Sequence, residues 1–296
     1  MNSLGDRLSR YKIISLIGMS KNAGKTTVLN YLLNHYKRSS LTVAITSIGR
    51  DGEDIDIATG TTKPKIYVPS GSIIATAEVL LGLSDITYEV LEVTDFNTPM
   101  GRIIIVRARS AGFVQIGGAS ISCRLSEILK ILQTFNVNKV LIDGAISRKS
   151  TSNPLLAEAV VLCVGASLSN DMGEVICKTK HAVSMLMLPK AKPEARNISI
   201  NGALTDSKIN SLLYSGENLD GTQIICEDPS KVLISKSIYE KLITRSAILS
   251  AENPANLVAI AVNPVSVRGY GFPKDVFLQR MAEEVRLPVF DVCWSS

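Results

Sequence analysis

Short hydrophobic runs alternate with longer amphipathic segments along most of the chain. We predict strands at 12–17, 42–47, 65–68, 102–108, 139–142, 159–164, 198–200, 223–226 and 257–262. We predict helices at 25–37, 72–82, 121–135, 172–187, 206–213, 236–243 and 273–285. Several strands are continuous apolar runs, as expected when helices cover both faces of a sheet. The alternation predicts an α/β fold with a doubly wound, mostly parallel sheet, whose ligands bind beyond the carboxyl ends of the strands.

A short proline-rich stretch marks the most linker-like point of the chain. Pro189-Lys190-Ala191-Lys192-Pro193 follows a long amphipathic segment, and prolines in such a place are typical of a connection. We therefore predict a first domain over 1–189 and a C-terminal α/β extension over 190–296. The extension either completes the same sheet or forms a lobe of its own.

The first predicted strand runs directly into a glycine-bounded loop and then into a helix. Residues 18–27 read G-M-S-K-N-A-G-K-T-T. A strand, loop and helix in this order form a phosphate cradle, because backbone N–H groups and the positive end of the helix point at the anion. We expect Lys25 to reach the terminal phosphates and the Thr26 hydroxyl to ligate Mg²⁺. The expected nucleotide contacts are Gly18, Lys21, Asn22, Ala23, Gly24, Lys25, Thr26 and Thr27.

The spacing of this loop departs from the common motif. Five residues separate Gly18 from Gly24, whereas the usual pattern is G-x-x-x-x-G-K-[ST]. A chance Gly-Lys-Thr in a strand–helix turn is the alternative. The preceding strand and the following helix favour phosphate binding, and hence a sheet of the P-loop NTPase type with bound ATP or GTP.

Two further strand ends carry candidate metal and phosphate ligands. Asp143 ends the strand 139–142 in the Walker B manner, so we expect it to hold the hydration shell of Mg²⁺ and to act with Lys25 in catalysis. Arg50 and Asp51 follow the strand 42–47. If that strand neighbours the first one, Arg50 contacts a phosphate, and Asp51, Glu53 or Asp54 holds Mg²⁺ or a water, with Asp51 as our candidate metal ligand. The alternative for both loops is an ordinary polar turn.

Asparagines at two other strand ends are candidate contacts for a purine base. Asn201 follows the strand 198–200, and Asn263 follows the strand 257–262. A side-chain amide offers both a donor and an acceptor to a base edge. The sequence does not distinguish between the two positions.

Composition restricts the class of protein. The net charge of +5 is spread along the chain without a basic block, so we expect no nucleic-acid partner. The cysteines lack a C-x-x-C pair and there are only two histidines, which fits mostly buried, reduced thiols and excludes a histidine-rich metal site. No secretory signal core and no apolar run of about 18 residues is present. We therefore expect a cytoplasmic protein that does not contact membranes.

The phosphate loop together with Asp143 resembles one particular P-loop class. G-x5-G-K-T-T after the first strand, with strand–Asp-Gly-Ala later, is similar to dethiobiotin synthetases and to MobB-type molybdopterin-guanine factors. The resemblance implies Mg²⁺-nucleotide binding and, in many members, a homodimer. MinD-like loops of this class carry an additional lysine at the position that is Ser20 here. Lys21 lies one place later, so the resemblance does not imply a Lys21 contact across a dimer.

A second resemblance covers most of the chain. Residues 41–53, 63–68, 73–77 and 142–149 are similar to the KamB family, which implies a reactivating-factor subunit for lysine 5,6-aminomutase. In that case nucleotide binding or slow hydrolysis drives exchange of damaged cobalamin, with the aminomutase and a second ATPase subunit as partners. The alternatives are a small-molecule kinase or ATP-dependent ligase of the dethiobiotin synthetase type, and a nucleotide-binding scaffold without turnover.

Overall fold

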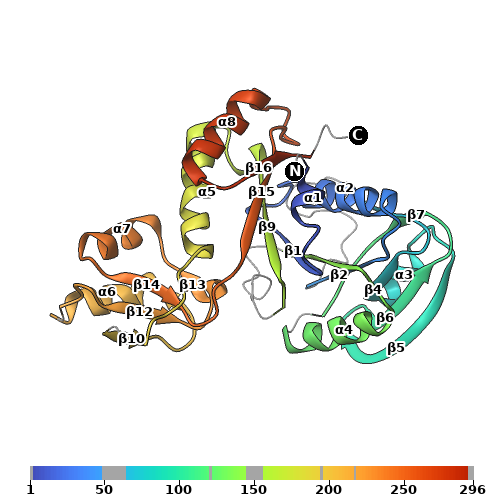
Figure 1. Cartoon of the computed structure of the whole chain (residues 1–296), viewed down its shortest axis with the longest axis horizontal. Coiled ribbons are helices and arrows are strands. Elements are labelled where there is room, and N and C mark those ends of the chain that lie inside the picture. The colour runs from blue at the N-terminus through green and yellow to red at the C-terminus, as the bar shows by residue number, and fades with distance from the viewer. Residues whose placement is uncertain are drawn as a thin grey trace.

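A nine-stranded sheet forms the centre of the molecule (Figure 1). The computed structural model describes residues 3–48, 65–119, 122–144, 156–193, 196–216 and 218–292. The strand order is β16-β15-β9-β1-β8-β2-β4-β6-β5. The strands are β1 (Ile13–Gly18), β2 (Val43–Ser47), β4 (Ile73–Ala77), β5 (Tyr88–Thr98), β6 (Gly101–Ala108), β8 (Lys139–Asp143), β9 (Ala159–Gly165), β15 (Leu257–Asn263) and β16 (Val289–Asp291). All neighbours pair in parallel except β4 with β6 and β5 with β6, so the prediction of an α/β fold with a mostly parallel sheet is confirmed.

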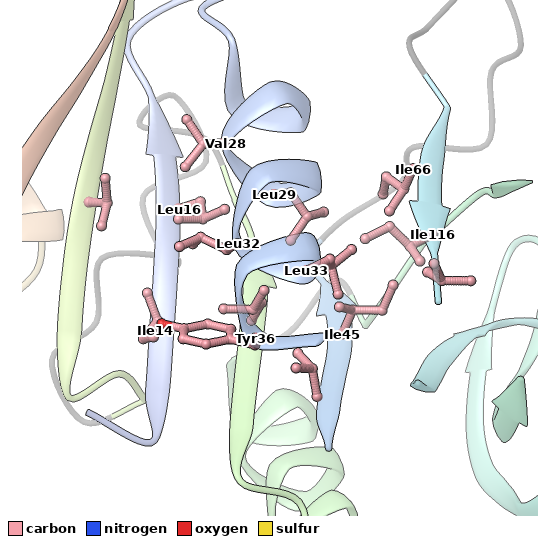
Figure 2. Packing of buried hydrophobic residues seen from close by; sticks show 14 of the residues in the cluster. Ile14, Leu16, Val28, Leu29, Leu32, Leu33, Tyr36, Ile45, Ile66 and Ile116 are labelled. Carbon is pink, nitrogen blue, oxygen red and sulfur yellow. The ribbon is translucent and has the colours of Figure 1, made fainter. Parts of the chain in front are cut away.

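Helices cover both faces of this sheet because each presents an apolar stripe to it. On α2 (Lys25–Arg38) the buried side chains recur at helical spacing and pack against β1 and β2 (Figure 2). The opposite face carries α4 (Ser122–Thr134), α5 (Met172–Leu186) and α8 (Lys274–Val285). Full burial of one leucine or isoleucine contributes about 1.5–3 kcal/mol, so these stripes fix where each helix lies.

The predicted helix over 72–82 is wrong. Its first half is β4, and only Glu78–Gly82 is helical, as α3. β4 is buried along its whole length between β2 and β6. β6 pairs with all five residues of β4, and β2 pairs with Ile73 and Ile74. This tertiary context overrides a local pattern that was compatible with a helix. The sequence also missed β5, whose side chains are mostly exposed or half-buried.

A two-stranded antiparallel ribbon lies beside α2, and the side chain of Asn30 on α2 forms hydrogen bonds with its backbone. The ribbon pairs β3 (Ile66–Val68) with β7 (Gly112–Val114). The Asn30 amide accepts from the Tyr67 N–H at 3.0 Å and donates to the Lys65 carbonyl at 3.4 Å. This amide therefore replaces a neighbouring strand at the edge of β3.

Residues after Pro189 contribute to two separate parts of the fold. A small lobe, residues 197–251, has its own hydrophobic core and lies at the left of Figure 1. Beyond it, β15, α8 and β16 return to the large sheet. The elements of the small lobe are β10 (Asn197–Ser199), β11 (Leu204–Thr205), α6 (Asp206–Tyr214), β12 (Gln223–Cys226), β13 (Val232–Leu233), α7 (Lys236–Thr244) and β14 (Ile248–Ala251).

Helix α5 is shared by the large sheet and the small lobe. Val175 and Val183 face the sheet, whereas Met185 belongs to the core of the small lobe. His181 Nε2 lies 3.0 Å from the Ile234 carbonyl oxygen. One helix therefore positions the lobe against the rest of the molecule. No helix in the described ranges has the length and apolar character needed to cross a bilayer.

Candidate functional site

The loop after β1 lies at the centre of the sheet edge. β1 is flanked by β8 and β9, so its carboxyl end has a strand end on either side. The Met19 N–H donates to the Cys163 carbonyl at 3.0 Å, which prolongs the pairing with β9 by one residue. The Ser20 and Ser167 hydroxyls lie 3.1 Å apart, and Ser167 also donates to the Lys21 carbonyl at 3.1 Å. The first half of the loop is thus held against β9.

Two residues with left-handed backbone turn the loop into the helix. Asn22 has φ 59° and Gly24 has φ 92°. Gly24 caps α2, and its carbonyl accepts the Val28 N–H at 3.0 Å. A Cβ at Gly24 would lie 3.1 Å from the Cβ of Asn263, so both the conformation and the contact favour glycine here. Left-handed residues beside a helix N-terminus are typical of the backbone nests that bind anions.

The side chain of Lys25 folds back over the start of the loop. A Cβ built on Gly18 would lie 3.0 Å from Lys25 Cδ and 3.1 Å from its Nζ. The ammonium group therefore lies within the span of the loop. Thr26 and Thr27 follow in the first turn of α2 and are half-buried. Lysine, hydroxyl groups and helix N-terminus are thus close together, an arrangement that is typical of phosphate-binding loops.

Asp143 lies on the strand next to β1, at the same edge of the sheet. It is in register with Leu16 on one side and with Ser47 on the other. The Gly144 N–H donates to the Leu16 carbonyl at 2.9 Å, and the Ile48 N–H donates to the Asp143 carbonyl at 3.1 Å. Adjacent strands are about 4.8 Å apart. The Asp143 backbone is thus held one strand away from the phosphate loop.

Two of the predicted site residues fall outside this description. Arg50 and Asp51 lie in 49–64, outside the described residues. Their roles were conditional on β2 neighbouring β1, and β2 instead pairs with β8 and β4. β2 itself is therefore separated from β1 by β8, the strand that carries Asp143.

The structure distinguishes the two asparagines that the sequence left equivalent. Asn263 lies beside Gly24, and its Oδ1 accepts the Val265 N–H at 3.0 Å. Its partner in register on β9 is Gly165, where a Cβ would lie 3.2 Å from Ala23 Cα. Asn201 instead follows β10 in the small lobe. β9 and β15 therefore line one side of the loop. Sequence reasoning named Asn263 but missed the contribution of β9, whose signal was the run of small residues at 165–167.

The donor set matches the way proteins hold Mg²⁺ on nucleotides. The described residues contain no cluster of three or more His, Cys, Asp or Glu side chains that would cage a metal. Mg²⁺ on a nucleotide usually needs only one or two protein oxygens, because phosphate and water supply the rest. The Thr26 hydroxyl and the Asp143 carboxylate are two oxygen donors of the type that Mg²⁺ prefers.

Neither a protein-family model nor a curated protein matches this chain.

Proposed function

We propose that this protein binds ATP or GTP with Mg²⁺ in the loop Gly18–Thr27, on a sheet of the P-loop NTPase type. The observation that carries the proposal is the position of Lys25, whose ammonium folds over Gly18 within a loop that ends at a helix N-terminus. A lysine charge beside a helix N-terminus suits a multiply charged anion such as a polyphosphate, because a monovalent carboxylate is already matched by the lysine alone.

Each residue has a distinct role in this proposal. Lys25 neutralises charge on the terminal phosphates, and Thr26 and Asp143 hold the metal side of the site. Mg²⁺, when bound, polarises the phosphate oxygens. The Asn263 amide, fixed by its bond to the Val265 N–H at 3.0 Å and lying beside Gly24, would contact the nucleotide on the β15 side of the loop. Slow hydrolysis is expected, because phosphoryl transfer depends on positioning that a partner completes.

Nucleotide binding is tested by comparing two lysines of the same helix. Lys25→Ala should lower the affinity for Mg²⁺-ATP and Mg²⁺-GTP by at least about 100-fold, as titration calorimetry would measure, because a charge-assisted contact is lost. Lys37→Ala, in the exposed last turn of α2, is the matched control and should bind normally. Equal affinities of the two variants would refute the proposed site.

We further propose that the bound nucleotide serves a cytoplasmic, chaperone-like factor for a cobalamin-dependent aminomutase such as lysine 5,6-aminomutase. The support is the KamB-like sequence over 41–53, 63–68, 73–77 and 142–149. A homodimer and a second ATPase subunit belong to the same proposal. The kinase or ligase alternative rests on the loop spacing that dethiobiotin synthetase shares.

A hydrolysis assay separates these functions. We expect slow turnover of the nucleotide by the protein alone, and a rise of roughly 10-fold or more when aminomutase carrying inactive cobalamin is added, because partner-completed sites accelerate phosphoryl transfer strongly. Active aminomutase is the control. Stimulation by a small carboxylic or phosphorylated metabolite, with no response to either form of the aminomutase, would favour the kinase or ligase.

A further inference from the structure

The cysteines differ in exposure more than the sequence indicated. We expected mostly buried thiols, but Cys123 and Cys177 are exposed, whereas Cys163 and Cys226 are buried. Cys177 lies on α5 and contacts a lysine from the small lobe. The Lys236 Nζ donates to its Sγ at 3.2 Å. Two nucleophilic side chains from different parts of the fold thus meet at the surface.

The surroundings of this pair leave it open to small reagents. The Lys236 side chain is 54% exposed, and its ammonium also lies 3.6 Å from the Glu240 carboxylate. The bond to the Cys177 thiol, with a smaller contribution from Glu240, raises the pKa of Lys236. Lys236 begins α7, whose N-cap is Ser235, so the helix fixes where the lysine stem emerges. An oxidant reaching Cys177 therefore acts within contact distance of an amine.

We propose that Cys177 and Lys236 form a covalent cross-link when peroxide oxidises the thiol. Hydrogen peroxide converts the thiol to a sulfenic acid and is itself reduced to water. The Lys236 ammonium first loses a proton to solvent. The resulting neutral amine then attacks the sulfenic sulfur. An S–N bond forms, the S–O bond breaks, and hydroxide leaves as water after taking up a proton. The product is a sulfenamide that lacks two hydrogen atoms relative to the starting pair.

The cross-link would connect the large sheet to the small lobe. α5 packs on the sheet through Val175 and Val183, and α7 belongs to the core of the lobe through Ile238 and Leu242. A bond between Cys177 and Lys236 therefore restricts movement of the lobe along α5. Thiol reductants reverse sulfenic derivatives of this kind, so the restriction is reversible.

The test treats the full chain with hydrogen peroxide and maps tryptic peptides by mass spectrometry. In the wild type we expect a peptide from α5 joined to one from α7, lighter by two hydrogen atoms and separated again by dithiothreitol. In Lys236→Met the joined peptide should be absent, and dimedone labelling of Cys177 should rise by roughly fivefold, because the sulfenic acid persists. Cys123, an exposed cysteine on α4, supplies the internal control.

Two results would overturn the proposal. One is an unchanged product at Cys177 in Lys236→Met, with the same progression to sulfinic acid as in the wild type. The other is joining of Cys177 to several different lysines, which would mean that the 3.2 Å contact does not direct the reaction. The Lys236 side chain is exposed, so circular dichroism should show that Lys236→Met is folded.

Discussion

At the scale of single residues, two lysines of this chain have opposite surroundings. Lys25 lies half-exposed over the phosphate loop. Lys139 is only 5% exposed, and its Nζ donates to the carbonyls of Ser9 and Tyr11, just beyond α1 (Leu4–Arg7). Burial lowers the pKa of Lys139, against an opposing effect of Glu158. Lys25 is therefore accessible to a ligand, whereas Lys139 serves as a hydrogen-bond donor to the backbone carbonyls that follow α1.

The same scale gives a prediction for the metal side of the site. Asp143→Asn keeps the shape of the side chain but removes its charge. It should leave nucleotide binding intact and lower Mg²⁺-dependent hydrolysis by roughly 10- to 100-fold, the usual effect of losing a metal-supporting carboxylate. Steady-state turnover at several Mg²⁺ concentrations is the measurement.

A second carboxylate at the same sheet edge provides the control for that experiment. Asp171 caps α5 and accepts the Gly173 N–H at 2.8 Å. Asparagine caps helices as well as aspartate does, so Asp171→Asn should behave as the wild type. Normal hydrolysis by Asp143→Asn would show that Asp143 is only a turn residue.

At the scale of elements, a buried amide in the small lobe binds the segment that enters the lobe from α5. The Gln223 Oε1 accepts from the Lys192 N–H at 3.0 Å and from the Ser250 hydroxyl at 3.1 Å. Its Nε2 donates to the Lys192 carbonyl at 2.9 Å and to Asn197 Oδ1 at 3.1 Å. The stretch that looked like a linker is thus bound to β12 through Lys192.

Removing this amide should weaken the attachment measurably. Gln223→Leu leaves the buried Ser250 hydroxyl and the partly buried backbone groups of Lys192 without their partner, which typically costs about 2–4 kcal/mol in total. Chemical denaturation would give the free energy of unfolding. Gln279→Leu is the matched control, because Gln279 is exposed on α8 and bonds only Glu283 among the described residues. Equal stabilities would mean that the network contributes nothing.

At the scale of the whole molecule, the chain leaves the large sheet after α5 and returns to it at β15. The small lobe is therefore an insertion tied at both ends, and α5 packs on both parts. Unfolding of the lobe would expose the side of α5 that carries Met185 to solvent. The titration of a group buried in the lobe should consequently affect the stability of the whole chain.

Cys226 is such a group, and its titration should lower the free energy of unfolding at alkaline pH. Burial, with a smaller contribution from Asp228, raises the pKa of its thiol to about 12, and the thiol donates to the Ser250 carbonyl at 3.4 Å. Below the ordinary thiol pKa of 9.0 the group is neutral in both states. Between this value and about 12, the thiol loses its proton in the unfolded chain but keeps it in the folded chain. Deprotonation therefore favours the unfolded state, and the free energy of unfolding falls as pH rises through this range.

This effect is measured as a difference between two proteins. The free energy of unfolding of the wild type relative to Cys226→Ala should fall between pH 9.0 and about 12, by up to about 1.4 kcal/mol per pH unit. Cys123→Ala, at an exposed cysteine, controls for the titration of other groups. A difference that stays constant with pH would contradict the prediction.

The sequence by itself determined the features that depend on near neighbours in the chain. Alternating apolar runs predicted the mostly parallel sheet, and Gly24-Lys25-Thr26 after the first strand predicted the turn from β1 into α2, because strand, turn and helix start are set by local backbone preferences. The tertiary structure decided what depends on distant segments. It made 73–77 a strand by pairing it with β6 along its length and with β2 at its start, placed β8 rather than β2 beside β1, and brought Asn263 rather than Asn201 beside Gly24. Strand order and lobe docking follow from burial shared across the whole chain, which no local pattern records.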